Sequence, residues 1–212
     1  MYIPKHFEET DAVVLHELIR AHPLGALVAA TAHGLEANHI PFLVHSESGP
    51  NGALHGHLAR ANPMWRQLAS DTRVLVIFQG PERFITPSWY PTKQETGKVV
   101  PTWNFAVVHV HGVARVIDDP RWVRDHLEQL TREHESRREK PWQVSDAPDE
   151  FIAQKLAHIV GLEIAIARLE GKWKVGQNLG ARDRAGVIEG LQRESGDAAR
   201  AMADLVARAA KD

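Results

Sequence analysis

This 212-residue chain contains two histidine pairs, His55/His57 and His109/His111, and in each pair one residue separates the two histidines. Histidine side chains are common metal ligands. In an extended strand this spacing places both imidazoles on one face. Together with His39 they could bind a metal ion. No carboxylate lies near them in sequence to complete an oxygenase-type triad. Polar lining of a barrel or contact with a ligand is therefore the favoured interpretation, and no metal is predicted.

The segment Leu54–Trp65, with the sequence LHGHLARANPMW, has the residues of an anion-binding loop. A strand end leads through small residues to Asn62-Pro63, a strong helix start whose free N–H groups suit a phosphate. Gly56 and Ala59 let the backbone approach a ligand, and His57 and Arg60 add donors. An ordinary strand–loop–helix connection has the same features, so both interpretations stay open on these residues alone.

Three further segments offer contacts to an aromatic ligand, namely PSWYPTK at 87–93, PTWNF at 101–105 and KWKVGQN at 172–178. Indole and phenol rings provide flat surfaces for such a ligand. Lysine, threonine and amide side chains provide a cation and hydrogen bonds to ring edges. The candidate residues are Trp89, Tyr90, Lys93, Thr102, Trp103, Asn104, Gln177 and Asn178. Core packing, solvation or turn capping explains each of them equally well when it is taken singly.

The chain lacks several kinds of catalytic group. It has no cysteine, and no serine lies in a G-x-S-x-G context. No catalytic residue is predicted, so any chemistry is expected to come from a cofactor. The net charge of -2 provides no overall field for nucleic acid. No apolar run approaches the roughly 20 residues of a membrane span, and a soluble cytoplasmic protein is expected.

The pattern of elements predicts a mainly β protein with peripheral helices. Strands are expected at 25–31, 35–45, 53–58, 73–78, 84–89, 103–117, 160–169 and 173–178. Helices are expected after Asp11, at Asn62-Pro63, after Asp119-Pro120, at 149–158 and over 183–210, and a polar loop at 91–101. Because regular helices do not separate the strands, a parallel βαβ sheet is disfavoured and an antiparallel barrel fits best.

Several blocks, in order, resemble the PaiB-like family of FMN-binding negative transcriptional regulators. They are MYIPKHF, GLEANHIPFL, LHGHLARANPMW, VLVIFQGPERFITPSWYPTK, VVPTWNFAVVHVHG and KWKVGQN, and they extend over most of residues 1–190. One departure is Gly176, where the family pattern K-x-S-Q-N has serine. The resemblance implies the FMN-binding split barrel, with six or more largely antiparallel strands in residues 1–182. A helical extension at 183–212 would pack on this domain or on its dimer partner.

The resemblance also implies a homodimer with FMN sites at its interface. Flavin-ring contacts would come from Asn38, His39, Ile40 and Pro41. Phosphate contacts would come from Gly56, His57, Leu58, Ala59, Arg60 and Asn62. Lys93 is a further candidate, Thr102, Trp103 and Asn104 would come from the second subunit, and Gln177 and Asn178 would close the site.

The function implied by the resemblance is FMN-binding regulation, with DNA as a candidate partner. The tail at 183–210 has mixed charge and no convincing helix-turn-helix pattern, whereas a direct repressor is expected to carry a basic stripe. An FMN-dependent NAD(P)H oxidoreductase, similar to flavin reductases or pyridoxamine phosphate oxidases, is the alternative. A haem-binding split-barrel protein using His39 or His111 is a third hypothesis.

Overall fold

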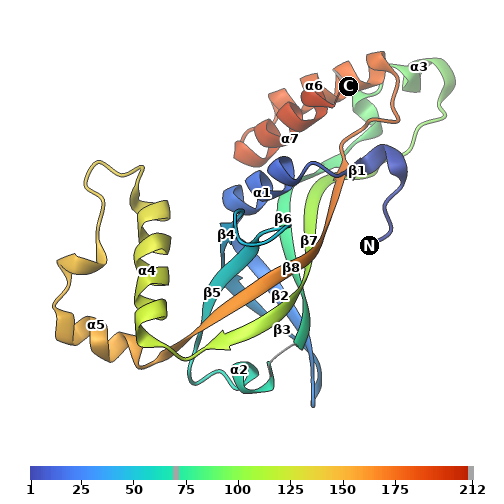
Figure 1. The fold of residues 1–212 in the computed structure, drawn as a ribbon. Coiled ribbons are helices and arrows are strands. Elements are labelled where there is room, and N and C mark those ends of the chain that lie inside the picture. Colours follow the sequence, from blue (N-terminus) through green and yellow to red (C-terminus); the bar gives the residue numbers. More distant parts are fainter. Residues whose placement is uncertain (69–71, 210–212) are drawn as a thin grey trace. The chain divides into compact units, whose positions relative to one another are not determined.

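The computed structural model describes residues 1–68 and 72–209, and its ribbon is drawn in Figure 1. The described residues form eight strands and seven α-helices, and the sheet has the strand order β3-β2-β6-β7-β8-β5-β4, with β1 paired to β8. The strand pairs with a defined register are all antiparallel. The predicted class, mainly β with helices and at least six largely antiparallel strands, is confirmed.

The chain forms two compact units. The first contains residues 1–18, 79–108 and 170–212, and the second contains residues 19–78 and 109–169. Three long strands contribute to both units: β6 (Thr72–Ile85), β7 (Thr102–Ile117) and β8 (Ile159–Lys174). The predicted division of the chain at residue 182 remains a prediction.

The long strands correct two sequence predictions. The segments 73–78 and 84–89 were expected to be separate strands, but β6 is continuous to Ile85, and Pro87–Trp89 forms the 3-10 helix η2. The segments 160–169 and 173–178 were also expected to be separate strands, but β8 is continuous from Ile159 to Lys174. The reason is strand pairing: β1 (Glu8–Glu9) pairs with Gly171 and Lys172, which keeps the backbone extended there.

In the second unit, β2 (Leu24–Thr31) and β3 (Gly34–Pro41) form a hairpin whose turn places Gly34 at a φ of 108°. The single strand expected at 35–45 is wrong. It is divided at the fully buried Phe42, whose N–H donates to the carbonyl of Pro23. After this break, β4 (Leu43–His45) pairs with β5 (Ala53–Ala59) instead of β2.

Helices of the second unit follow the predicted starts. Met64–Gln67 forms the one-turn helix α2. Pro120–Glu135 forms α4, whose cap Asp119 accepts a hydrogen bond from the N–H of Arg121. Val144–Asp146 forms the 3-10 helix η3, and Asp149–Leu156 forms α5.

The first unit contains η1 (Lys5–Phe7), β1, the start of α1 (Ala12–Ala21), η2, α3 (Thr92–Thr96), α6 (Ala181–Arg193) and α7 (Asp197–Arg208). The polar loop expected at 91–101 thus includes a short helix.

Figure 1 shows α6 and α7 side by side, in the red part of the ribbon. Their apolar faces share one buried core with η2 and β6, through Ile85, Tyr90, Val175, Val187, Leu191, Met202, Ala203 and Val206. Residues 210–212 of the predicted tail lie outside the described residues.

No helix among the described residues combines the length and apolar character needed to cross a membrane.

Candidate functional site

A cavity of about 310 Å³ lies entirely within the first unit. It is lined by Tyr90, Thr92, Lys98, Val99, Val100, Thr102, Asn104, Lys174, Gly176, Asn178, Leu179 and Asp183. Its walls come from the α3 region, the start of β7, the end of β8 and the start of α6. Apolar side chains are combined there with a few polar ones, which is the usual composition of a small-molecule site.

Asn104 is the most informative residue of this cavity. It is only 2% exposed, and its amide nitrogen Nδ2 has no hydrogen-bond partner among the described residues. A buried donor without a partner costs about 1–3 kcal/mol. A ligand acceptor in the cavity would remove that cost, so Asn104 marks the position where a carbonyl or ring nitrogen is expected.

Lys174 supplies a fixed cation at the same cavity. Its Nζ donates to the hydroxyl of Thr102 and to the carbonyl oxygen of Trp103, the latter at 2.7 Å. Burial, followed by the neighbouring Lys172, lowers the pKa of Lys174. Lys174 was not predicted from the sequence. The alternation in KWK could have indicated it, because it places Lys172 and Lys174 on one strand face.

Asp183 supplies the negative charge of the lining, and it too was missed from sequence. Its carboxylate accepts hydrogen bonds from the N–H of Thr92 at 3.2 Å and from the hydroxyl of Thr92 at 2.7 Å. Burial, and secondarily Asp183, raise the pKa of Tyr90. The cavity therefore has both donors and an acceptor at its wall.

Of the predicted first-unit residues, Thr102, Asn104 and Asn178 line the cavity. Lys93 is exposed on α3, and Trp103 is half-exposed, with its indole N–H donating to Glu82. Gln177 bonds its own turn, accepting from the N–H of Val175 and donating to the carbonyl of Trp173. At Gly176, where the family pattern has serine, the backbone is left-handed with a φ of 85°.

The predicted phosphate segment lies in the second unit, and much of it is already engaged. A Cβ on Gly56 would meet Ile40 and Phe42 at 3.0 Å, so this glycine permits close packing within the sheet. Leu58 is buried. The imidazole of His57 lies against His126, with Nδ1 and Nε2 3.2 Å apart.

Arg60 holds an anion, but that anion is a side chain of the protein. Its two terminal nitrogens bond both oxygens of Asp118, at 2.9 and 2.5 Å, in a bidentate pair. The carbonyls of Ala157 and Ile159 accept from the same guanidinium. The hydrogen bond from Arg60 keeps the pKa of Asp118 below its usual value. The guanidinium is therefore oriented in advance, and the half-exposed carboxylate occupies the place of an external anion.

Asn62 and Asn38, predicted for phosphate and ring contacts, bond each other. Nδ2 of Asn62 donates to Oδ1 of Asn38 at 2.8 Å, and Oδ1 of Asn62 accepts from the N–H of Met64. His39 and Ala59 are exposed, Pro41 is half-buried and Ile40 is buried. Within the second unit, β3 and the start of α2 are thus joined by the predicted side chains.

An imidazole cluster in the second unit was not predicted from sequence. His45 and His55 lie with ring centroids 3.9 Å apart, Trp122 lies 5.0 Å from His55, and His126 stacks on Trp122 at 5.5 Å. Burial is the main cause that lowers the pKa of His55 to about 4 and that of His126 to about 3. Both imidazoles are therefore neutral near pH 7.

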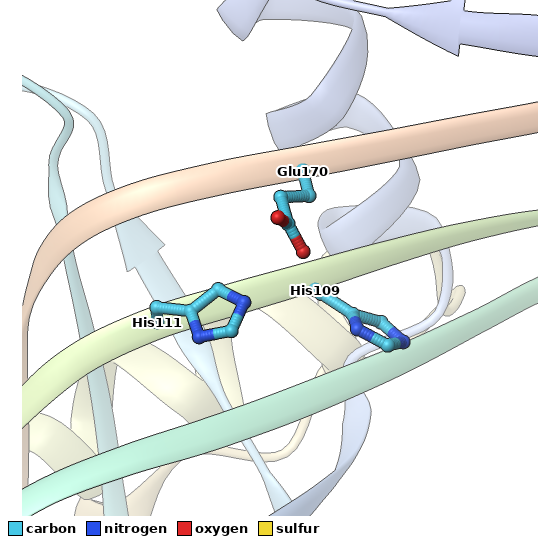
Figure 2. Close-up of side chains that lie close together, drawn as sticks. All are labelled: His109, His111 and Glu170. Atoms are coloured by element: carbon cyan, nitrogen blue, oxygen red, sulfur yellow. The ribbon is translucent and has the colours of Figure 1, made fainter. Parts of the chain in front are cut away.

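The pair His109 and His111, drawn in Figure 2, lies on β7 as expected. Its ring centroids are 6.5 Å apart. Both histidines belong to the second unit, whereas Glu170, drawn in the same view, is a residue of the first. Within the second unit these two imidazoles are fewer than the three or four protein ligands of most metal centres.

Comparison with known proteins identifies relatives over most of the chain. A family model described as "Putative FMN-binding domain" matches residues 1–168. An uncharacterised protein of Emericella nidulans is 35% identical over 97% of this chain and 96% of its own length. The "Protease synthase and sporulation protein PAI 2" of Bacillus subtilis is 31% identical over 97% of this chain and 96% of its own length.

Among solved structures, the FAD and haem binding protein of Mycobacterium smegmatis has a TM-score of 0.59 at 18% identity, and the match covers 80% of this chain and 74% of that one. At that identity the similarity concerns the fold, and it agrees with the split barrel expected from the sequence.

Proposed function

The chain belongs to the FMN-binding domain family with PaiB-like relatives, and from this premise we propose that it is a homodimeric FMN-binding protein whose first-unit cavity receives the edge of the flavin ring. FMN, the cofactor expected from sequence, is the cofactor after which the family is described. The observation that carries the proposal is the buried amide nitrogen of Asn104 at the cavity wall, which has no hydrogen-bond partner among the described residues.

The residues of the cavity fit a flavin ring. The pyrimidine edge of a flavin has carbonyl and nitrogen acceptors and one N–H donor. Asn104 and Lys174 can donate to the former, and Asp183 can accept from the latter. When bound, FMN would supply redox chemistry, while the chain's own residues bind and orient it.

The volume of the cavity supports contributions from a second protomer. About 310 Å³ is near the lower end of the ~300–1,000 Å³ typical of ligand pockets, enough for part of FMN. We propose that the phosphate binds the second unit of the partner protomer, at Arg60, in exchange for Asp118. The ion pair is partly exposed and screened by solvent, so this exchange of one anion for another costs little.

Exposed aromatic side chains of the first unit favour dimerisation. Phe84 and Trp103 are about half-exposed and make an edge-to-face pair with centroids 5.8 Å apart. Light scattering is expected to give about twice the chain mass of 23.7 kDa. Replacing Trp103 by alanine should produce monomer, whereas replacing Trp142, an exposed residue of the second unit, should not. A monomeric parent protein that binds FMN would remove the dimer from the proposal.

We further propose that any regulatory role does not use α6 and α7 to read DNA bases. The PAI 2 relative is named for protease synthesis and sporulation. In this chain, however, Arg182, Arg193 and Arg200 are ion-paired with acidic side chains, which reduces the positive charge that these helices present to DNA. Sequence-specific DNA binding that resists salt and is lost when these arginines are replaced would overturn this part.

The central test is direct. The purified protein should show the absorption of bound flavin or take up added FMN with quenching of flavin fluorescence. A colourless protein that also fails to bind added FMN contradicts the proposal. Steady NAD(P)H oxidation by the loaded protein would instead establish the oxidoreductase alternative.

A further inference from the structure

The ammonium of Lys174 is held rigidly at the cavity wall. It donates to the hydroxyl of Thr102 and to the carbonyl of Trp103. An ammonium has three N–H donors. Two are therefore used among the described residues, and the third is available to a ligand in the cavity. A charge fixed in this way needs little reorganisation when charge develops on that ligand.

The charges of the cavity lining are unequal. Lys98 and Lys174 contribute two positive charges, and Asp183 contributes one negative charge. Lys98 is exposed, so solvent screens it strongly, whereas Lys174 is partly buried. Asp183 already accepts two hydrogen bonds from Thr92. Lys174 is thus the cation best placed to act on a bound ring.

We propose that Lys174 makes the cavity bind reduced flavin more tightly than oxidised flavin. The inference rests on the proposed function. Two electrons from a donor such as dithionite and one proton convert the oxidised ring to its anionic reduced form, whose negative charge lies on the pyrimidine edge. A fixed ammonium stabilises that anion more than the neutral ring, which raises the reduction potential of the bound flavin.

The experiment compares the midpoint potential of bound FMN, and the dissociation constants of the two redox states, in the parent protein and in Lys174→Met. The ratio of oxidised to reduced dissociation constants should fall at least tenfold in the variant, equal to about 30 mV for a two-electron couple. Lys174→Arg should retain most of the effect. Riboflavin should give the same result as FMN, because the charge concerned is on the ring.

A second variant, Asp183→Asn, should change the reduction potential of the bound flavin in the opposite direction. Removing the only carboxylate among the described lining residues should raise the potential of the bound flavin, whereas Lys174→Met lowers it. This variant keeps the inference testable if Lys174→Met fails to fold, which the melting temperature of the flavin-free protein would reveal.

The outcomes separate the two proposals. If the parent protein binds neither FMN nor riboflavin, the proposed function fails. If the parent binds FMN but Lys174→Met, or in its absence Asp183→Asn, leaves the potential unchanged, the role of Lys174 is overturned and flavin binding stands.

Discussion

Nδ1 of His57 in β5 lies 3.2 Å from Nε2 of His126 in α4, so one of these imidazoles donates a hydrogen bond to the other. His126 is 2% exposed, and its second ring nitrogen has no partner among the described residues. Protonating both rings would place a donor against a donor in a buried position. This contact therefore disfavours the doubly protonated form of the pair.

The first prediction concerns pH. The pKa values of His55, about 4, and His126, about 3, lie below the ordinary value of 6.5, so the unfolded chain binds more protons than the folded one in mild acid. Stability is thus full above pH 6.5 and decreases as the pH falls towards 4. At pH 5 each of the two residues should lower the free energy of unfolding by up to about 2 kcal/mol.

Urea unfolding at pH 7.5 and pH 5 measures this loss. His126→Phe should reduce the difference in the free energy of unfolding between pH 7.5 and pH 5. Replacing His33, an exposed histidine, by glutamine should leave that difference unchanged. An equal loss in the parent and in His126→Phe would show that other groups cause the acid sensitivity.

The second prediction concerns Arg60 and Asp118. Arg60→Ala should weaken FMN binding by about 1–3 kcal/mol if the guanidinium takes the phosphate. Asp118→Asn should tighten it by up to about 1 kcal/mol, because a competing anion is weakened. Riboflavin has no phosphate, so neither change should alter riboflavin binding. Unchanged FMN affinity in a fluorescence titration of Arg60→Ala would remove Arg60 from the site.

The third prediction concerns Asn104. Asn104→Leu has similar volume and removes the unpaired buried amide, so the free energy of unfolding of the flavin-free protein should stay the same or rise. The same change should weaken both FMN and riboflavin by about 1–2 kcal/mol, since the ring loses a donor. Lower stability together with unchanged flavin affinity would mean that the amide serves the fold instead.

The fourth prediction concerns the packing of α6 on η2. A Cβ on Gly190 would lie 2.3 Å from the indole of Trp89, so Gly190→Ala should cost about 1–3 kcal/mol of stability. Gly180→Ala is the matched control, because nothing lies within 4 Å of its Cβ position. Similar melting temperatures for the two variants would contradict the close contact.

The sequence predicted the elements where local signals were strong. Asp119-Pro120 begins α4, and alternation over 103–117 gives β7. Prediction from the sequence failed where pairing with distant residues overrides local preference. Strand β1 keeps β8 extended through Gly171, and the burial of Phe42 divides the strand expected at 35–45.

The sequence alone determined the family and the cofactor, since ordered motif blocks carry that information, and it proposed the segments of the candidate site. Only the tertiary structure decided which side chains are available. Arg60 is held by Asp118, which is 58 residues away, and His57 by His126, which is 69 residues away. Lys174 and Asp183 meet Asn104 around one cavity. A hydrogen-bonding group is committed or free according to its neighbours in space, and folding sets those neighbours.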